Sequence, residues 1–299
     1  MLLVLAGGAF AGWKTTGGSS PDRGAIAPRP TPVRTPAKPK ARGPLQLLAA
    51  PDPSRTRLVV AGRAAILVDA SSGTVLWQKR PHLRLPVAST TKIMTAVLAL
   101  ERLAPKRIIT IDNSVPRVAP FREGLRAGER VPAWKLFYGL LLYSGNDDAL
   151  ALGIAAAGSR GAFISLMNRK ARQLGMRDSH FTSPSGVIDR GNHSSAWDMA
   201  ALARYAMWNP RFRDVVRTRV KRMTWPAPTF GKIYVNKNHL LGSYRGANGV
   251  KTGWTTLAQH CLVASAKRGG VRLIAVVLRS PDAYADARRM LDLRFGLRS

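Results

Sequence analysis

The segment Pro86-Val87-Ala88-Ser89-Thr90-Thr91-Lys92-Ile93-Met94-Thr95-Ala96 combines an apolar pattern with two reactive side chains. The pattern predicts a mostly buried helix from Ser89 to Leu103, which Pro105 closes. Ser89 and Lys92 are three positions apart, so their Cβ atoms are expected about 5 to 6 Å apart on one helical face. A buried lysine with a lowered pKa can take the proton of a serine hydroxyl and make it a nucleophile. Taken alone, the pattern also fits a capping serine beside a solvated lysine.

Two further short segments follow along the chain, and they favour the catalytic interpretation of Ser89 and Lys92 over the capping one. Ser144-Gly145-Asn146 separates two predicted helices, where polar side chains can face a cleft. Lys251-Thr252-Gly253 opens a strand region, and its glycine lets a substrate backbone approach closely. An isolated match to a pattern as short as Ser-x-x-Lys is expected about once by chance in a chain of this length. The order and the spacing of the three segments therefore carry the functional signal.

Strand-like segments lie at both ends of the chain and helical segments lie between them. Residues 64–68 and 74–77 flank the turn Ser71-Ser72-Gly73, and residues 261–266 and 271–278 flank Arg268-Gly269-Gly270, so both pairs predict hairpins. Helices are predicted at 132–142, 147–157, 161–174, 196–208 and 282–293. The sequence thus predicts an α/β fold in which both chain ends build one antiparallel sheet, flanked by helices, with an inserted helical subdomain.

On these segments the chain resembles the serine D-alanyl-D-alanine carboxypeptidases, the low-molecular-mass penicillin-binding proteins of the acyl-serine transferase superfamily that also contains the β-lactamases. The resemblance runs from about Ala64 to Phe295 and includes Gly139 to Asp147, Ser194 to Ala200 and Gly249 to Thr255. It implies a fold like that of the β-lactamases and DD-peptidases.

The resemblance also implies catalytic roles. Ser89 would attack the carbonyl between the two terminal D-alanines, with Lys92 as base. Ser144 would relay a proton with Lys251, and Asn146 would hold the substrate amide. Water would then hydrolyse the acyl-enzyme, and β-lactam antibiotics would acylate the same serine.

A second set of positions is implied to bind the peptidoglycan stem peptide. Lys251 and Thr252 would hold its terminal carboxylate, a cation matched to an anion, and the backbone N–H groups of Ser89 and Trp254 would form the oxyanion hole. Some relatives place an arginine in an Asn-x-Asn segment, where this chain has Lys237 and thus a weaker point-charge contact. The substrate-binding positions are expected to be Lys251, Thr252, Gly253, Trp254, Thr255 and Lys237.

Two other functions compete with this interpretation. A class A β-lactamase shares the nucleophile, the lysine and the Lys-Thr-Gly strand, but it deacylates with a glutamate between the second and third motifs, and this chain has no glutamate after Glu129. A catalytically silent wall-binding protein would keep the fold for recognition alone, although every catalytic side chain is present.

The charge of the chain is extreme, since 47 Lys and Arg face 16 Asp and Glu, a net charge of +31. Such a field favours polyanions. The basic residues are dispersed and follow no nucleic-acid motif, so an anionic cell envelope is the expected partner, while an arginine-rich genome accounts for the charge equally well.

Cys261 is the single cysteine, which excludes an intramolecular disulfide. The five scattered histidines show no zinc pattern, so no metal or cofactor is expected.

The N-terminal region is expected to direct the protein out of the cytoplasm. Leu2 to Gly12 form an apolar run of 11 residues, too short for the roughly 20 that span a bilayer, so residues 1–19 are interpreted as a signal peptide or a truncated signal anchor. Residues 20–56 are rich in Pro, Lys and Arg and are expected to form a disordered linker. Residues 57–299 form the predicted catalytic domain, which is expected to be secreted or tethered to the membrane. Because the chain stops soon after Phe295, any tether is expected at the N-terminus.

Overall fold

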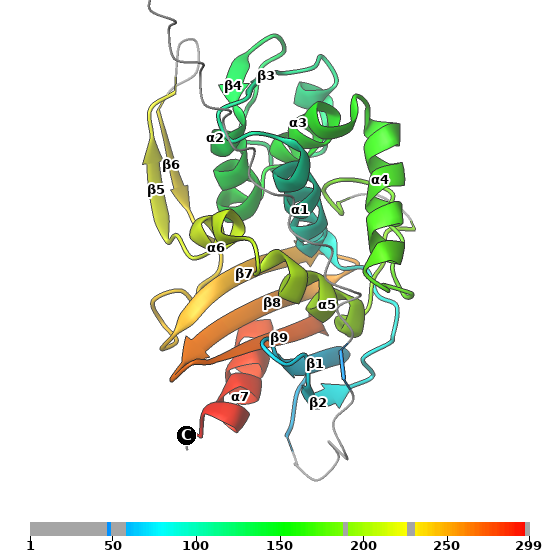
Figure 1. Cartoon of the computed structure of the whole chain (residues 1–299), viewed down its shortest axis with the longest axis vertical. Coiled ribbons are helices and arrows are strands. Elements are labelled where there is room, and N and C mark those ends of the chain that lie inside the picture. The colour runs from blue at the N-terminus through cyan, green and yellow to red at the C-terminus, as the bar shows by residue number, and fades with distance from the viewer. Residues whose placement is uncertain (1–46, 49–57, 188–190, 226–230, 297–299) are drawn as a thin grey trace, which may run out of the picture. The chain divides into compact units, whose positions relative to one another are not determined.

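The computed structural model describes residues 47–48, 58–187, 191–225 and 231–296. Their main feature is a five-stranded sheet with the order β2-β1-β9-β8-β7, in which every neighbouring pair is antiparallel (Figure 1). The sheet joins strands from both ends of the chain, as the sequence predicts. Its strands are β1 (Ala64–Asp69), β2 (Val75–Lys79), β7 (Ala247–Thr255), β8 (Gln259–Arg268) and β9 (Val271–Ser280).

Helices cover both faces of this sheet because its central strands are apolar on both sides. Along β1, Ile66 and Val68 pack into one apolar core, whereas Ala65 and Leu67 pack into another. This alternation follows from the two-residue period of a strand. The first core includes α1 (Lys92–Arg102) and α5 (Ala196–Ala206), and the second includes α7 (Ala283–Phe295) on the opposite face (Figure 1).

The helical subdomain is inserted between β2 and β7. Its longer elements match the predicted helices, although the helix predicted over 132–142 ends at Tyr138 and continues as a π-helical turn, Gly139–Tyr143. The helix predicted from Ser89 begins instead as the 3₁₀ turn Ala88–Thr91, which leads into α1. The further helices are α2 (Ala133–Tyr138), α3 (Asn146–Ala157), α4 (Arg160–Gln173) and α6 (Pro210–Val216).

Two small antiparallel sheets and α6 were not predicted. The sheets pair β3 (Ile108–Thr110) with β4 (Arg130–Pro132), and β5 (Val220–Met223) with β6 (Lys232–Val235). Strands of three or four residues are too short for an alternation that stands out from the surrounding chain. The second pair matters for function, because the chain leaves β6 and enters the region of the pocket at Lys237.

Most of the N-terminal region, including the predicted signal segment, lies outside the described residues, and only Leu47 and Leu48 of the predicted linker are described. Leu47 is buried, and the backbone of Leu48 pairs with Gly73 and Val75 beside β2. An apolar side chain that can reach the core is buried even within a proline-rich stretch.

Within the described ranges no single helix is long and apolar enough to cross a bilayer. Only α3 and α4 taken together have the required length and composition, and they are bent by 84° relative to each other.

Candidate active site

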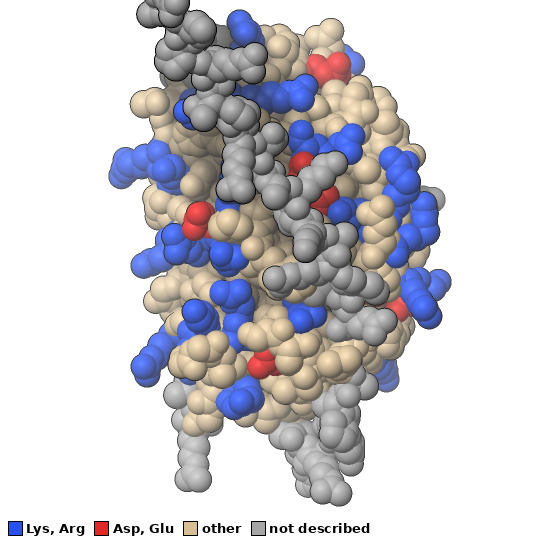
Figure 2. Space-filling view, in the orientation of Figure 1, with Lys and Arg blue, Asp and Glu red and all other residues tan. Residues whose placement is uncertain are grey.

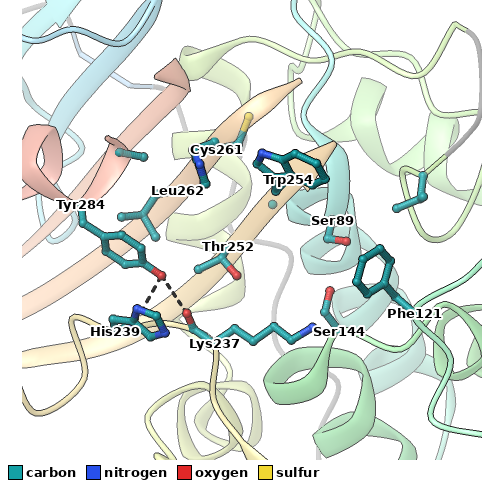
Figure 3. Close-up of a pocket in the computed structure, with 14 residues that line it drawn as sticks. Ser89, Phe121, Ser144, Lys237, His239, Thr252, Trp254, Cys261, Leu262 and Tyr284 are labelled. Carbon is teal, nitrogen blue, oxygen red and sulfur yellow. Dashed lines mark hydrogen bonds between the residues drawn. The ribbon is translucent and has the colours of Figure 1, made fainter. Parts of the chain in front are cut away.

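A pocket of about 330 Å³ opens where β7, at one edge of the large sheet, meets the 3₁₀ turn Ala88–Thr91 and the Ser144 turn (Figure 3). The segments that the sequence singles out converge here from distant parts of the chain. The lining includes Ser89, Ser144, Lys237, Thr252, Gly253 and Trp254. Lys92, Asn146 and Lys251 are buried and contribute contacts to the same site.

The 3₁₀ turn presents Ser89 to the pocket. Ala88, the residue before it, has a positive φ of 46°, and Thr90 ties the turn together by donating its hydroxyl to Val87 O at 2.6 Å. Neither the 3₁₀ turn nor α1 has a side-chain hydrogen bond at its N-cap, and Ser89 Oγ lies 2.9 Å from Nζ of the fully buried Lys92. The capping alternative is therefore wrong, and the serine is held against the lysine.

Lys92 Nζ has three partners, which suit a general base. It lies 2.9 Å from Ser89 Oγ, 2.8 Å from Asn146 Oδ1 and 3.2 Å from the carbonyl oxygen of Ser185. A neutral amine has two hydrogens and one lone pair. Because two of the partners can only accept, the neutral amine would donate to them and turn its lone pair toward Ser89 Oγ.

The electrostatics of the site favour this neutral amine. Lys92 is fully buried, and burial lowers its pKa well below the ordinary lysine value, with the charge of Lys251 adding to the effect. The carboxyl of Asp148 acts in the opposite direction and raises the pKa of Lys92. Burial also lowers the pKa of Lys251, to about 7, and the charge of Lys237 contributes. Two buried amines in one site therefore titrate far from their ordinary range.

Ser144 reaches the pocket from a strained turn. It ends the π-helical turn in the left-handed conformation, with φ of 76°, and its N–H donates to Gly139 O at 2.8 Å. The implied relay between Ser144 and Lys251 has no direct hydrogen bond within the described part of the chain. Lys251 Nζ donates instead to the carbonyl oxygen of Thr252 at 3.0 Å.

Asn146 contacts the protein rather than an open subsite. Its Oδ1 accepts from Lys92, and its Nδ2 donates to Pro120 O at 2.6 Å. Its backbone N–H donates to Phe121 O at 2.9 Å. The resemblance implies a role in holding the substrate amide, whereas here Asn146 links the base to the loop that carries Phe121.

The β7 strand passes directly against the nucleophile turn at Gly253. A Cβ atom at this position would lie 2.9 Å from Val87 O and 3.1 Å from the backbone nitrogens of Ser89 and Thr90. Such separations leave no room for a side chain, so glycine is required for this approach. Thr252 and Trp254 line the pocket on either side, but Thr255 turns its hydroxyl to Ala258 N at 3.0 Å and is not among the lining residues.

The pocket residues that the sequence analysis missed include Phe121, His239 and Tyr284. Phe121 reaches the pocket from a loop with a positive φ, and Tyr284 comes from the start of α7 and donates its hydroxyl to Lys237 O at 2.7 Å (Figure 3). No local pattern marks a loop aromatic or the first turn of a C-terminal helix as part of a distant site.

The residues that the structure describes contain no group of three or more His, Cys, Asp or Glu side chains placed to hold a metal ion. Cys261 lines the pocket but is buried, and burial raises the pKa of its thiol to about 11. It is therefore protonated at neutral pH and a poor nucleophile.

Comparison with known proteins agrees with this geometry. A family model described as D-alanyl-D-alanine carboxypeptidase matches residues 51–282. A D-alanyl-D-alanine carboxypeptidase of Bacillus subtilis (strain 168) is 33% identical over 248 residues, 78% of this chain and 62% of the relative. Another, from Streptomyces sp. (strain K15), is 36% identical over 269 residues, 83% of this chain and 92% of the relative. The chain thus spans less than two thirds of the Bacillus protein but most of the Streptomyces protein.

Solved structures share the fold over most of the chain. An evolved putative penicillin-binding protein homolog from Mycobacterium tuberculosis superposes with a TM-score of 0.77 at 30% identity, over 82% of this chain and 95% of that one. The Streptomyces K15 DD-transpeptidase gives a TM-score of 0.75 at 33% identity, over 81% of this chain and all of the other.

Proposed function

The chain belongs to the D-alanyl-D-alanine carboxypeptidase family, and from that premise we propose that it removes the terminal D-alanine from peptidoglycan stem peptides through an acyl-enzyme on Ser89. The observation that carries the proposal is the 2.9 Å contact between Lys92 Nζ and Ser89 Oγ in the wall of an open pocket. A hydroxyl beside a buried amine of lowered pKa is the arrangement that nucleophilic catalysis needs.

In the first step Ser89 Oγ attacks the carbonyl carbon between the two D-alanines, and its proton passes to Lys92 Nζ. The amine can receive it because Asn146 Oδ1 and Ser185 O already hold its other hydrogens. The negative charge on the carbonyl oxygen is assigned to the backbone N–H groups of Ser89 and Trp254, and the bare backbone of Gly253 brings these two elements together.

In the second half of the reaction the C–N bond breaks and the leaving amine takes a proton. We assign this transfer to Ser144, which lines the pocket and passes to the leaving amine the proton that Lys92 took from Ser89, with Lys251 behind it. The relay requires Lys251 Nζ to leave the carbonyl oxygen of Thr252 and turn toward Ser144. Water then attacks the acyl carbon, the neutral Lys92 takes its proton and returns it to Ser89 Oγ as the ester bond breaks, and the shortened peptide leaves.

The carboxylate end of the substrate is assigned to the cationic side of the pocket. Thr252 and Lys237 line this side, and Lys251 is buried beside them. Hydrogen bonds between an ammonium and a carboxylate are stronger than neutral ones, so a free C-terminus is preferred here. β-Lactams, which present a strained amide and a carboxylate, are proposed to acylate Ser89 in the same pose.

The protein is proposed to act outside the cytoplasm, where peptidoglycan is found, and to meet an anionic envelope. Its net charge is +31, and Figure 2 shows Lys and Arg side chains spread over the viewed face with few Asp and Glu among them. A field of this sign attracts wall polymers and acidic headgroups and accelerates their encounter with the enzyme. An N-terminal signal or tether belongs to the same proposal.

The test measures free D-alanine after the full-length protein is incubated with a peptide that ends in D-Ala-D-Ala, beside Ser89→Ala. Release by the unaltered protein and none by Ser89→Ala is the expected result. If the unaltered protein releases nothing but still binds the peptide, the silent wall-binding alternative replaces the enzyme.

The β-lactamase alternative is tested by intact mass after exposure to benzylpenicillin. A long-lived adduct is expected, since no glutamate after Glu129 is available to drive deacylation. Rapid loss of the adduct would favour a β-lactamase, and an adduct on Ser89→Ala would show that another residue is the nucleophile.

A further inference from the structure

The ammonium of Lys237 lies within cation–π distance of two aromatic rings at the pocket. Its Nζ is 4.9 Å from the ring centroid of Tyr143 and 5.4 Å from that of Phe121. Within the described residues it forms no salt bridge with a carboxylate. Ring faces attract a cation but replace only part of its hydration. The Lys237 ammonium therefore has aromatic neighbours but no anionic partner among the described residues.

The backbone of Lys237 is fixed on both sides. Its N–H donates to Leu142 O at 3.3 Å, next to the Ser144 turn, and its carbonyl oxygen accepts from the Tyr284 hydroxyl at 2.7 Å. Figure 3 shows the side chain extended toward Ser144, with Phe121 beside its end. Although Lys237 is an exposed residue, these backbone bonds and the two rings beside its amine leave it less side-chain freedom than a lysine without such contacts.

Phe121 adopts a backbone conformation that bulky residues rarely accept. Its φ is +68°, and the residue remains 58% exposed although its side chain is large and apolar. The loop is held in this conformation by Asn146, whose backbone N–H donates to Phe121 O at 2.9 Å and whose Nδ2 donates to Pro120 O at 2.6 Å. Strain that the surroundings enforce at the mouth of a pocket points to a function for the strained residue.

We propose that Phe121, together with Tyr143, is a positioning residue that orders the Lys237 ammonium for the terminal carboxylate of the substrate, and so sets the preference for a free over a blocked C-terminus. The proposal rests on the function proposed above for the pocket. The aromatic pair would thus contribute to substrate selection, a role that the three sequence segments do not indicate.

The physical basis is preorganisation. An ordered and partly dehydrated ammonium binds a carboxylate without first losing side-chain freedom or a full shell of water. Burial lowers the pKa of Lys237, as expected for an ammonium whose lost hydration is not fully replaced. A substrate carboxylate would stabilise the charged form of Lys237 in place of the lost hydration, whereas a neutral C-terminal amide would not.

The test compares two peptides that end in D-Ala-D-Ala, one with a free carboxylate and one with a C-terminal amide. Dissociation constants are measured by calorimetry on the full-length Ser89→Ala protein, so that binding is read without turnover. The readout is the ratio of the amide to the acid dissociation constant. Release of D-alanine by the unaltered protein is measured in parallel, which separates failure of this inference from failure of the proposed function.

Phe121→Leu keeps the apolar volume but removes the ring, and it is expected to lower the ratio about three- to tenfold. Phe121→Tyr, which keeps the ring, should stay within about twofold of the parent. Trp208→Leu is the matched control, because it removes a ring 5.6 Å from the Arg204 guanidinium and outside the pocket lining. The control should leave the ratio unchanged.

A second comparison places Phe121→Leu in a Lys237→Met background, where the ring has no cation to position. Lys237→Met alone should lower the ratio, and adding Phe121→Leu should lower it no further. The inference is overturned if Phe121→Leu weakens both peptides equally, since the ring would then only shape the pocket. An unchanged ratio in Lys237→Met, or binding of neither peptide, also overturns it.

Discussion

Replacing Asn146 by aspartate tests whether this residue controls the base. Asn146 Oδ1 lies 2.8 Å from Lys92 Nζ, and neither atom is exposed to bulk water, since both residues are buried. The substitution changes shape little but places a negative charge beside the amine. A nearby negative charge stabilises the ammonium, so the pKa of Lys92 rises, and the fraction of neutral amine at a given pH falls.

The size of the effect follows from the geometry. An opposite charge in such contact moves a pKa by about one to three units, each worth about 1.4 kcal/mol. At pH values below the pKa of the parent's base each unit lowers the neutral fraction tenfold, so acylation there should fall about 10- to 1000-fold. Aspartate also loses the bond from Nδ2 to Pro120 O, which should lower the free energy of unfolding by about 1 to 3 kcal/mol.

The assay is the second-order rate of acylation by a fluorescent penicillin, followed from pH 5 to pH 10 in parent, Asn146→Asp and Asn146→Ala. The acid limb of Asn146→Asp should lie about one to three pH units above that of the parent, with the rate recovering at high pH. Asn146→Ala adds no charge, so its limb should not move upward. If Asn146→Asp is slower at every pH with an unmoved limb, Asn146 acts on the ligand and not on Lys92.

Three more predictions follow from buried groups and close contacts. Burial lowers the pKa of Lys251 to about 7, so the affinity of Ser89→Ala for a carboxylate-ended peptide should fall as pH rises through about 7, and Lys251→Arg, which stays charged, should remove that fall in a calorimetric titration from pH 6 to 9. Gly253→Ala puts a Cβ 2.9 Å from Val87 O, so acylation should drop about 10- to 100-fold, with a loss of about 1 to 3 kcal/mol in unfolding free energy; an unaffected rate would mean that this close approach is not needed. Burial raises the pKa of Glu123 from 4.5 to about 7, which favours the protonated acid in the folded state, so its stabilising effect is present below about pH 4.5 and is lost as pH rises through about 7. Urea unfolding should therefore show Glu123→Gln removing about 3 kcal/mol of that loss between pH 5 and pH 9, and equal pH dependence in both proteins would contradict it.

The large elements of the fold could be predicted because each carries a long periodic signal. β8 and β9 are ten-residue strands joined by a glycine turn, and α3 and α4 run for 12 and 14 residues. The three-residue strands β3 and β4 carry no comparable signal, and they pair across a separation that only the tertiary structure sets. The π-helical turn before Ser144 was missed for another reason, because its apolar residues also fit an ordinary α-helix.

The site could be predicted as far as its motifs extend. Ser89 and Lys92 share one turn, so their contact follows from spacing, and the structure places them 2.9 Å apart. The partners of Asn146 could not be predicted, because Pro120 and Phe121 belong to a loop about 25 residues upstream whose path depends on a strained backbone. Sequence patterns thus identify reactive groups, while the contacts that orient them depend on packing between distant segments.

The two buried amines of the pocket are coupled through substrate binding. The charge of Lys251 lowers the pKa of Lys92, so any anion that neutralises Lys251 must raise that pKa. A substrate carboxylate bound beside Lys251 would therefore make Lys92 a stronger base once the substrate is in place. Since kcat/KM reports the free enzyme and kcat the complex, the acid limb of kcat should lie at higher pH than that of kcat/KM. A substrate with a C-terminal amide brings no such charge, so its two limbs should coincide, and the same separation of limbs for both substrates would exclude this coupling.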